Sequence, residues 1–197
     1  LWESRVMEQE LPTWFNHVKP NFESYLTFPN ENIIPVPLNV LQIGAYKGDT
    51  TQWLLDNKNI NRIVDVDTWE GSIEHEGTFD FNQVERVYDE RFTAVEKVEK
   101  RKGTSDRYFA TRPEGETFNV IYIDGDHTAL QTAIDSLNAW RILEVGGIMI
   151  FDDYDWHMYQ GTPLHPKDGI DCVLRLFRGR YNLIVTNYQV WIRKTAE

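Results

Sequence analysis

The chain has 197 residues, of which 41% are hydrophobic and 13% aromatic, enough for one folded domain with its own core. Its formal net charge of −11 argues against a nucleic-acid groove, because phosphate contacts need a basic surface. The single cysteine, Cys172, excludes an intrachain disulfide and fits the reducing cytoplasm, and with no long apolar run we expect neither a membrane span nor a secretory leader.

Residues 1–37 hold five of the eight prolines, interspersed with aromatic residues. Proline removes a backbone donor and clashes with the preceding helical turn, so this segment cannot form one long helix. We predict an irregular arm with a short helix, held against the body by its aromatic side chains. The expected organisation is an N-terminal arm or cap over residues 1–37, which covers a sheet edge or roofs a pocket, and one main domain over residues 38–197.

From residue 38 onward the hydrophobic pattern alternates between strand-like and helix-like segments. Five runs predict strands: NVLQIG, RIVDVD, VEKRKG, FNVIYIDGD and GGIMIFDD. Four segments between and after them predict helices: TTQWLLDN, residues 81–97, TALQTAIDSLNAWRIL and GIDCVLRLFRG. The third of these helices opens with Thr128 and Gln131 at the spacing of a capping box, and it carries Leu130, Ile134 and Leu137 on one face.

The last two β-rich runs, YNLIVTN and QVWIRK, are joined by a connection too short for a helical crossover, so they must pair antiparallel. Strands that alternate with helices predict a parallel sheet covered on both faces. The predicted fold class is therefore α/β: a three-layer, doubly wound (Rossmann-like), mostly parallel sheet with an antiparallel C-terminal hairpin.

Glycines and carboxylates follow the apolar strands at the points where these strands end. In open α/β sheets, ligands bind outside the carboxyl ends of the strands. The residues expected at that edge are Gly44, Gly48, Asp67, Asp124, Asp126, Asp152 and Asp153. One such carboxylate is often only a helix cap, but five at one edge predict a functional site.

The turn after the first strand reads GAYKG, and its glycines Gly44 and Gly48 let the backbone approach a ligand closely. Asp67 follows Gly44 by 23 residues, the spacing at which an acid accepts the hydroxyls of a ribose. The turn lacks the paired glycines of G-x-G-x-x-G and the Gly-Lys-Ser/Thr of a P-loop. The sequence therefore predicts a nucleoside ligand rather than a dinucleotide or a nucleoside triphosphate.

The chain resembles the class I S-adenosylmethionine-dependent methyltransferases in five segments, which occur in the family's order: VLQIGAYKGDTTQWLL, VDVDTWEGSIEH, FNVIYIDGDHTAL, GGIMIFDDYDW and YQVWIRK. More narrowly, it is similar to the small-molecule O-methyltransferase-like branch with IDGDH and FDDY motifs. The resemblance spans about residues 36–195. It implies that the main domain is catalytic and transfers a methyl group from S-adenosylmethionine to a small-molecule acceptor, with a hydroxyl as the expected nucleophile.

The resemblance also implies which residues bind the cofactor. Gly44, Ala45, Tyr46 and Gly48 would wrap the methionine part. Gln42 stands where the family usually has an acid, a departure that could weaken cofactor binding although an amide still accepts a hydrogen bond.

The remaining cofactor contacts follow the second and third strands. Asp67 would accept the ribose hydroxyls, with Thr68 and Trp69 beside them. Gly103 and Ser105, in KGTSDRY, match a family G-x-S near the adenine.

On the acceptor side, Asp124 would lie next to the methyl sulfonium. The positions that match magnesium ligands in sugar-modifying relatives are Asp124, Asp152 and Asp153. Carboxylates with room for water suit magnesium, which keeps part of its hydration shell. Asp126 or His127 would act as the base that deprotonates the acceptor, and His75 would line the acceptor pocket.

Two other classes of function stay open. RIVDVDTW contains D-x-D-T after an apolar strand, close to the D-x-D-x-T of haloacid-dehalogenase-like phosphatases, where Asp65 would be the nucleophile and Asp67 the acid. Against it, the glycine turn would have no role and the required lysine is not clearly placed. The other class is a non-catalytic module with a methyltransferase fold, which Gln42 favours. Oligomeric state is not readable from the sequence.

Overall fold

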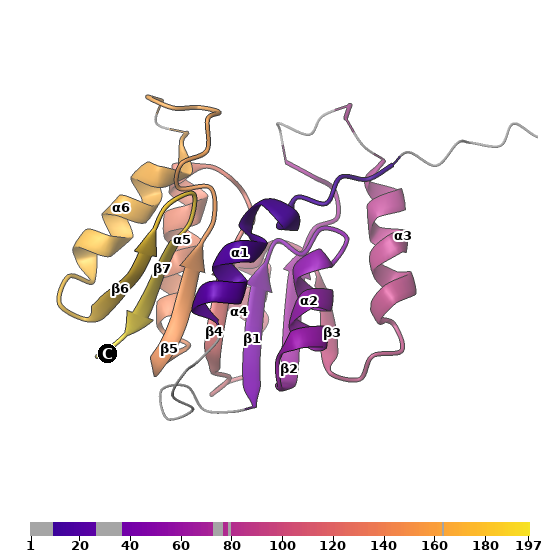
Figure 1. Ribbon diagram of the computed structural model, residues 1–197, viewed down its shortest axis with the longest axis horizontal. Helices are drawn as coiled ribbons and strands as arrows, with labels where there is room; N and C mark the ends of the chain where they lie inside the picture. The colour runs from indigo at the N-terminus through magenta and orange to yellow at the C-terminus, as the bar shows by residue number, and fades with distance from the viewer. Residues whose placement is uncertain (1–9, 27–36, 73–76, 79, 163) are drawn as a thin grey trace, which may run out of the picture.

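The computed structural model describes residues 10–26, 37–72, 77–78, 80–162 and 164–197. One sheet contains seven strands (Figure 1): β1 (Leu38–Ile43), β2 (Ile60–Asp67), β3 (Val98–Lys102), β4 (Phe118–Ile123), β5 (Leu143–Phe151), β6 (Tyr181–Thr186) and β7 (Val190–Lys194). The described helices are α1 (Phe15–Tyr25), α2 (Asp49–Asn57), α3 (Phe81–Phe92), α4 (Ser105–Thr111), α5 (Ala129–Trp140) and α6 (Pro166–Leu176). Each of these helices is too short or too polar to span a lipid bilayer.

The strand order is β3-β2-β1-β4-β5-β7-β6. Strands β1 to β5 pair in parallel, and β7 is antiparallel to both of its neighbours. The predicted fold class, with its antiparallel C-terminal hairpin, is confirmed. The charged run VEKRKG is also a strand, because β3 lies at the edge of the sheet, where its side chains remain partly exposed.

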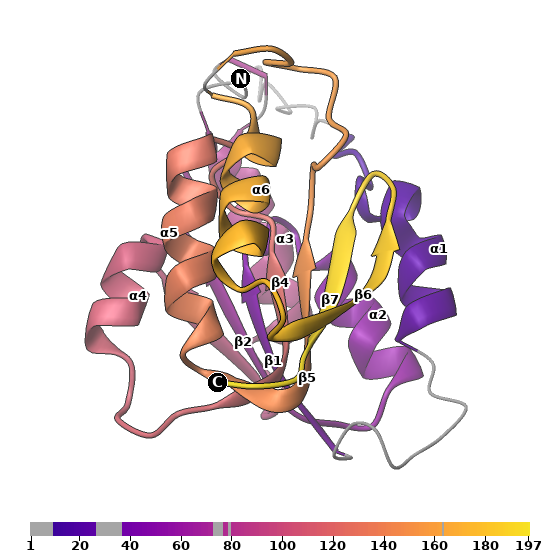
Figure 2. The ribbon, with the colours of Figure 1, turned by 90° about the vertical axis from the view of Figure 1, so that its left-hand side faces the viewer.

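Helices cover both faces of the sheet. Figure 2 shows α1 and α2 on one face and α4, α5 and α6 on the other. Alternate residues of β1 point to opposite faces, so Val40 belongs to the cluster with α1, and Leu41 to the cluster with α5 and α6. This three-layer arrangement leaves only the two ends of the strands open to ligands.

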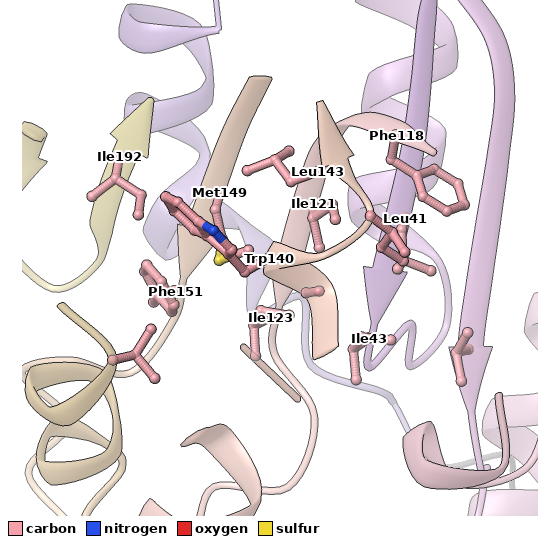
Figure 3. Packing of buried hydrophobic residues seen from close by; sticks show 14 of the residues in the cluster. Leu41, Ile43, Phe118, Ile121, Ile123, Trp140, Leu143, Met149, Phe151 and Ile192 are labelled. Carbon is pink, nitrogen blue, oxygen red and sulfur yellow. The ribbon is translucent and has the colours of Figure 1, made fainter. Parts of the chain in front are cut away.

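The cluster on the α4–α6 face is the larger of the two (Figure 3). Leu41 and Ile121 are completely buried, and Trp140 stacks on Phe177 with ring centroids 4.0 Å apart. Burying one such aliphatic side chain contributes about 1.5–3 kcal/mol. This packing fixes where β1 and β4 end in the sheet, and therefore where the loops that follow them lie.

The N-terminal arm contains the short helix predicted for it. In α1, Phe15, Val18 and Phe22 are buried, and the Phe22 ring makes edge contacts with Tyr122 and Trp191. The aromatic residues therefore hold α1 against the sheet, as the sequence suggests. A division into an arm and a main domain stays a prediction.

The third predicted helix, α5, forms with Thr128 as its N-cap. Its leucines, however, do not pack inward: Leu130 is 72% exposed and Leu137 37% exposed. The helix instead buries Thr132, Asp135, Ser136, Ala139 and Trp140, and α6 approaches its start so closely that a Cβ on Gly169 would lie 2.1 Å from the Ala129 carbonyl oxygen.

Candidate active site

Two cavities adjoin at the carboxyl ends of the central strands. The first cavity, about 280 Å³, lies against the ends of β1 and β2 and the start of α4. The second cavity, about 580 Å³, lies beneath the start of α1 and against the ends of β4 and β5. The residues that line both cavities are Trp14, Gly44, Tyr46, Asp124 and His127.

Gly44 ends β1 in a conformation that needs glycine. Its φ is +88°, and a Cβ there would lie 1.8 Å from the carbonyl oxygen of Asp124. Gly48 is also left-handed, and a Cβ would lie 2.1 Å from the Phe92 ring. The turn between β1 and α2 can therefore lie against the β4 loop at Gly44 and against α3 at Gly48 only because these positions carry no side chain.

Asp67 holds the glycine turn through its side chain. One carboxylate oxygen accepts the backbone N–H groups of Ala45 and Tyr46, both at 2.8 Å, and the other accepts the N–H of Trp69 at 2.7 Å. Burial raises the pKa of Asp67, and these hydrogen bonds oppose the shift. Asp67 lines the first cavity, so the predicted ribose acceptor is also the residue that shapes the turn.

Gln42, in β1, also stabilises the glycine turn. Its amide nitrogen donates to the carbonyl oxygen of Gly44 at 2.9 Å, and its amide oxygen accepts from the Thr51 hydroxyl at 3.3 Å. An ionised acid at this position could not donate to Gly44. The departure from the family pattern therefore has a structural role in this chain.

The other predicted cofactor contacts divide into two groups. Thr68, Gly103 and Ser105 line the first cavity. Trp69 is buried and lines neither cavity; its indole N–H donates to the carbonyl oxygen of Tyr46 at 2.7 Å. Trp69 therefore stabilises the glycine turn without lining either cavity.

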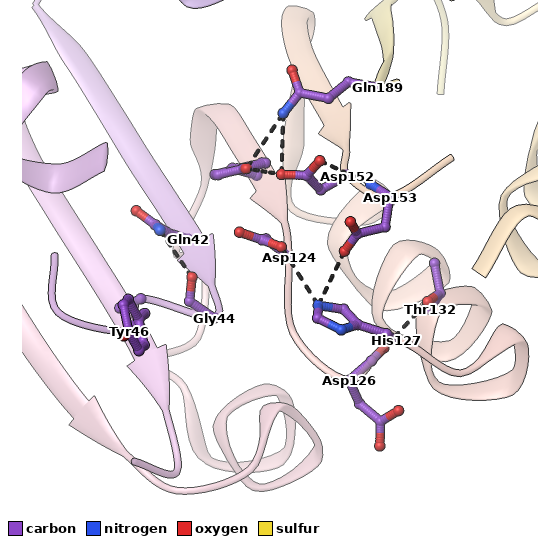
Figure 4. A network of polar contacts seen from close by, with 12 residues as sticks. Gln42, Gly44, Tyr46, Asp124, Asp126, His127, Thr132, Asp152, Asp153 and Gln189 are labelled. Atoms are coloured by element: carbon purple, nitrogen blue, oxygen red, sulfur yellow. Dashed lines mark hydrogen bonds and ion pairs between the residues drawn. The ribbon is translucent and has the colours of Figure 1, made fainter. Parts of the chain in front are cut away.

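A cluster of three side chains lies where the two cavities meet. His127 Nε2 is 3.1 Å from one Asp153 carboxylate oxygen and 3.7 Å from one of Asp124 (Figure 4). One ligand atom from each of the three residues lies within 4.8 Å of the others. Burial raises the pKa of Asp124 to about 6, the contact with His127 lowers it, and the charge of Asp153 raises it.

Asp152, predicted with Asp124 and Asp153 as a metal ligand, is oriented away from this cluster. Its carboxylate accepts from the Tyr122 hydroxyl, from the Gln189 amide at 3.2 Å and from the backbone N–H of Asp153 at 2.8 Å. Burial and the charge of Asp124 raise the pKa of Asp152 well above its ordinary value. Within the described residues, the structure groups two of the three predicted ligands with His127 instead.

The two predicted bases are not placed alike. The Asp126 carboxylate points away from Asp124 and Asp153 in Figure 4 and accepts the backbone N–H of Thr128 at 2.9 Å. Asp126 is exposed and lines only the first cavity, whereas His127 lines both. The geometry therefore favours His127 as the base.

Asp65 cannot serve as a phosphatase nucleophile. It is completely buried and lines neither cavity, and one of its oxygens accepts both the Thr51 and Tyr88 hydroxyls at 2.7 Å. A phosphate has no access to this carboxylate. The phosphatase alternative is not favoured.

We expect Asp65→Asn to gain stability relative to the wild type as the pH rises to neutrality. Burial raises the pKa of Asp65 to about 6, so the folded state favours the protonated acid. Wild-type stability should therefore fall as the pH rises from about 4 to about 6, so that the variant gains about 3 kcal/mol relative to the wild type over that range. Urea unfolding at several pH values measures the difference. The matched exposed change Asp56→Asn should show no such gain, and equal pH profiles for Asp65→Asn and wild type would contradict the assignment.

Several site residues carry no motif in the sequence. Trp14 lies over Tyr46 with ring centroids 4.4 Å apart, and the buried Lys47 ammonium donates to the Leu11 carbonyl and the Thr13 hydroxyl. These contacts join the N-terminal arm to the glycine turn. In the sequence, only the aromatic content of the arm points to these residues, because the contacts that they make depend on the fold. His75 lies outside the described residues.

A model of the family described as "Methyltransferase domain" matches residues 41–154. None of the curated protein sequences resembles this chain closely enough to count as a match.

Solved structures match most of the chain at low sequence identity. An O-methyltransferase from Bacillus cereus in complex with SAH is 17% identical, covers 90% of this chain and 97% of its own, and has a TM-score of 0.58. TomG, an O-methyltransferase of tomaymycin synthesis from Streptomyces achromogenes in complex with SAM, is 14% identical with a TM-score of 0.57, over 91% of this chain and 96% of its own. MycE, a methyltransferase of the mycinamycin pathway in complex with Mg and SAH, is 13% identical with a TM-score of 0.60, over 90% of this chain and 49% of its own.

Proposed function

Because the chain belongs to the methyltransferase-domain family, we propose that it transfers a methyl group from S-adenosylmethionine to a hydroxyl of a small molecule. The observation that carries this proposal is the junction of the two cavities at Gly44, Asp124 and His127. A cofactor in the first cavity and an acceptor in the second would meet there. In-line displacement needs this kind of adjacency, because positioning supplies much of the rate.

The first cavity fits a nucleoside cofactor. Gly44 leaves the backbone accessible, Asp67 and Thr68 offer oxygens at the end of β2, and Ser105 begins α4 on the far wall. When bound, S-adenosylmethionine supplies an activated methyl group on a sulfonium. The complexes of the Bacillus cereus and Streptomyces achromogenes enzymes support this choice of cofactor.

In the second cavity, His127 would accept the proton of the acceptor hydroxyl. The imidazole would hold this proton, and the cofactor, when bound, would supply the methyl group to the acceptor oxygen. The carboxylates of Asp153 and Asp124 lie on either side of Nε2 and stabilise the positive charge that results. A base at this junction argues for an enzyme rather than a non-catalytic module.

The second cavity favours a small molecule as acceptor. It is enclosed by α1 and lined by several aromatic side chains, among them Trp14, Phe15 and Trp156. A net charge of −11 disfavours nucleic acid as the alternative.

Calorimetric titration with S-adenosylhomocysteine tests the cofactor assignment. We expect micromolar binding, after which mass spectrometry of reactions with S-adenosylmethionine and a panel of hydroxylated small molecules would identify the acceptor. Absence of S-adenosylhomocysteine binding would refute the proposal.

A divalent cation, with Mg²⁺ as the ion expected from the sequence, is a second proposal for the same cluster. The residues that would hold it are Asp124, His127 and Asp153, whose ligand atoms lie close together. Its charge would draw the proton from the acceptor hydroxyl. The Mg complex of MycE supports this proposal.

We expect Mn²⁺, as a paramagnetic substitute, to bind the protein and to bind about tenfold or more weakly after Asp153→Asn. Electron paramagnetic resonance of free Mn²⁺ measures the affinity. Asp155→Asn is the matched control, because Asp155 is exposed on the same loop and lines neither cavity. Equal Mn²⁺ affinity in both variants would place the ion elsewhere, and methyl transfer that continues in excess chelator would assign the proton to His127 without a metal.

A further inference from the structure

We propose that the tip of the C-terminal hairpin is part of the active centre, and that Tyr188 is a positioning residue that fixes Asp153 and, through it, His127. This inference rests on the proposed function. The tip, residues 187–189, lies between β6 and β7. Tyr188 and Gln189 begin the segment YQVWIRK, to which the resemblance assigns no role in the site.

Asp153 is in a conformation that requires outside support. Its φ is +58°, in the left-handed region that a residue with a side chain rarely adopts. The Tyr188 hydroxyl donates to one of its carboxylate oxygens at 2.6 Å. The other oxygen is the one that lies 3.1 Å from His127 Nε2. Tyr188 therefore occupies one side of the carboxylate and turns the other toward the imidazole.

The neighbouring residue, Gln189, holds the other aspartate of the pair. It is completely buried, and its amide nitrogen donates to Asp152 at 3.2 Å (Figure 4). Its amide oxygen accepts from the Trp191 indole at 2.9 Å and from the Asn21 amide at 3.0 Å. Both ends of the Gln189 amide are thus fixed, so consecutive residues of the hairpin tip hold consecutive aspartates after β5.

The tip is braced from the opposite side by the N-terminal arm. The Tyr188 ring meets the His17 ring of α1 edge-on, with centroids 4.4 Å apart. His17 and Tyr188 both line the second cavity. An unbroken series of side-chain contacts therefore runs from α1 through the hairpin tip to Asp153 and His127. These residues form one wall of the proposed acceptor site.

Tyr188→Phe tests this role, because it removes the hydroxyl and keeps the ring that packs on His17. Tyr181→Phe is the matched control: Tyr181 lies in the same hairpin, and its hydroxyl donates to the carbonyl oxygen of Leu174 at 3.3 Å, away from the cluster. Mn²⁺ affinity is the first readout, and the side-chain ¹H–¹⁵N signals of His127 are the second. The His127 signals are assigned with His127→Gln.

For Tyr188→Phe we expect about tenfold weaker Mn²⁺ binding and shifted His127 signals, the size of effect typical of lost support behind a ligand. Tyr181→Phe should leave both readouts as in the wild type, and S-adenosylhomocysteine should bind all three proteins alike. With an acceptor in hand, Tyr188→Phe should lower kcat and leave KM for S-adenosylmethionine unchanged.

The outcomes separate the two proposals. Wild-type His127 signals in Tyr188→Phe would overturn the positioning role, whatever the metal result. If the wild type binds no Mn²⁺ but the His127 signals shift only in Tyr188→Phe, the positioning role stands and the metal proposal fails. Loss of S-adenosylhomocysteine binding in the wild type would instead refute the proposed function.

Discussion

Replacing Asp67 by alanine is expected to weaken S-adenosylhomocysteine binding by about two orders of magnitude or more. The substitution removes the proposed acceptor of the ribose hydroxyls and leaves the N–H groups of Ala45, Tyr46 and Trp69 without their carboxylate. Each buried donor left unpaired costs about 1–3 kcal/mol, so the affinity should fall by about 100-fold or more. Calorimetry measures the loss directly.

Two further variants show whether the effect is specific. Asp67→Asn keeps an oxygen that accepts hydrogen bonds, and we expect it to bind more weakly than the wild type but more tightly than Asp67→Ala. Asp56→Ala removes an exposed acid of α2 and should bind as the wild type does. Binding by Asp67→Ala at wild-type affinity would remove Asp67 from the cofactor site.

Replacing His127 by glutamine is expected to stop methyl transfer while cofactor binding persists. His127 lies at the junction of the two cavities, between the carboxylates of Asp124 and Asp153. Glutamine is similar in size and polar but cannot take up a proton. Because general bases contribute about 10²- to 10⁴-fold, kcat for the acceptor found by mass spectrometry should fall by that factor.

His157→Gln is the matched control for this variant. His157 is exposed and lines neither cavity, although it follows the Trp156 that packs beside His127. Its kcat should equal that of the wild type. A His127→Gln enzyme with full activity would return the role of base to Asp126 or to a bound metal.

The strands and the edge of the sheet that carries the site could be predicted because local sequence patterns indicate both. Buried parallel strands read as apolar runs, and each run ends where the chain must turn. Gly44 marks such a turn by its missing side chain, and Asp67 ends the neighbouring strand, so their proximity follows from parallel pairing alone.

The orientation of α5 could not be predicted in the same way. Periodicity shows that Leu130 and Leu137 share a face, but it does not show which face turns inward. That choice depends on the neighbouring helices. Gly169 lets α6 lie against the backbone of Ala129, a contact between helices that periodicity does not reveal.

The arrangement of the site carboxylates is also beyond the sequence. Asp152 and Asp153 are adjacent, yet one faces Tyr122 and Gln189 and the other faces Tyr188 and His127. Their partners come from β4 and from the hairpin tip, distant in the chain. The sequence predicts which carboxylates reach the edge, and tertiary contacts decide what each of them does there.

The contact between α1 and β7 has a consequence for biosynthesis. Phe22 and Asn21 lie against Trp191 and Gln189, so α1 depends on a segment that is synthesised well after it, 168 residues later for Asn21 and Gln189. Ribosomes add residues one at a time from the N-terminus, and until residues 189–191 leave the exit tunnel the apolar side of α1 lacks these partners. We expect the nascent arm to remain undocked, and open to chaperones, until that point of translation. Closure of the second cavity would then be among the last events of folding.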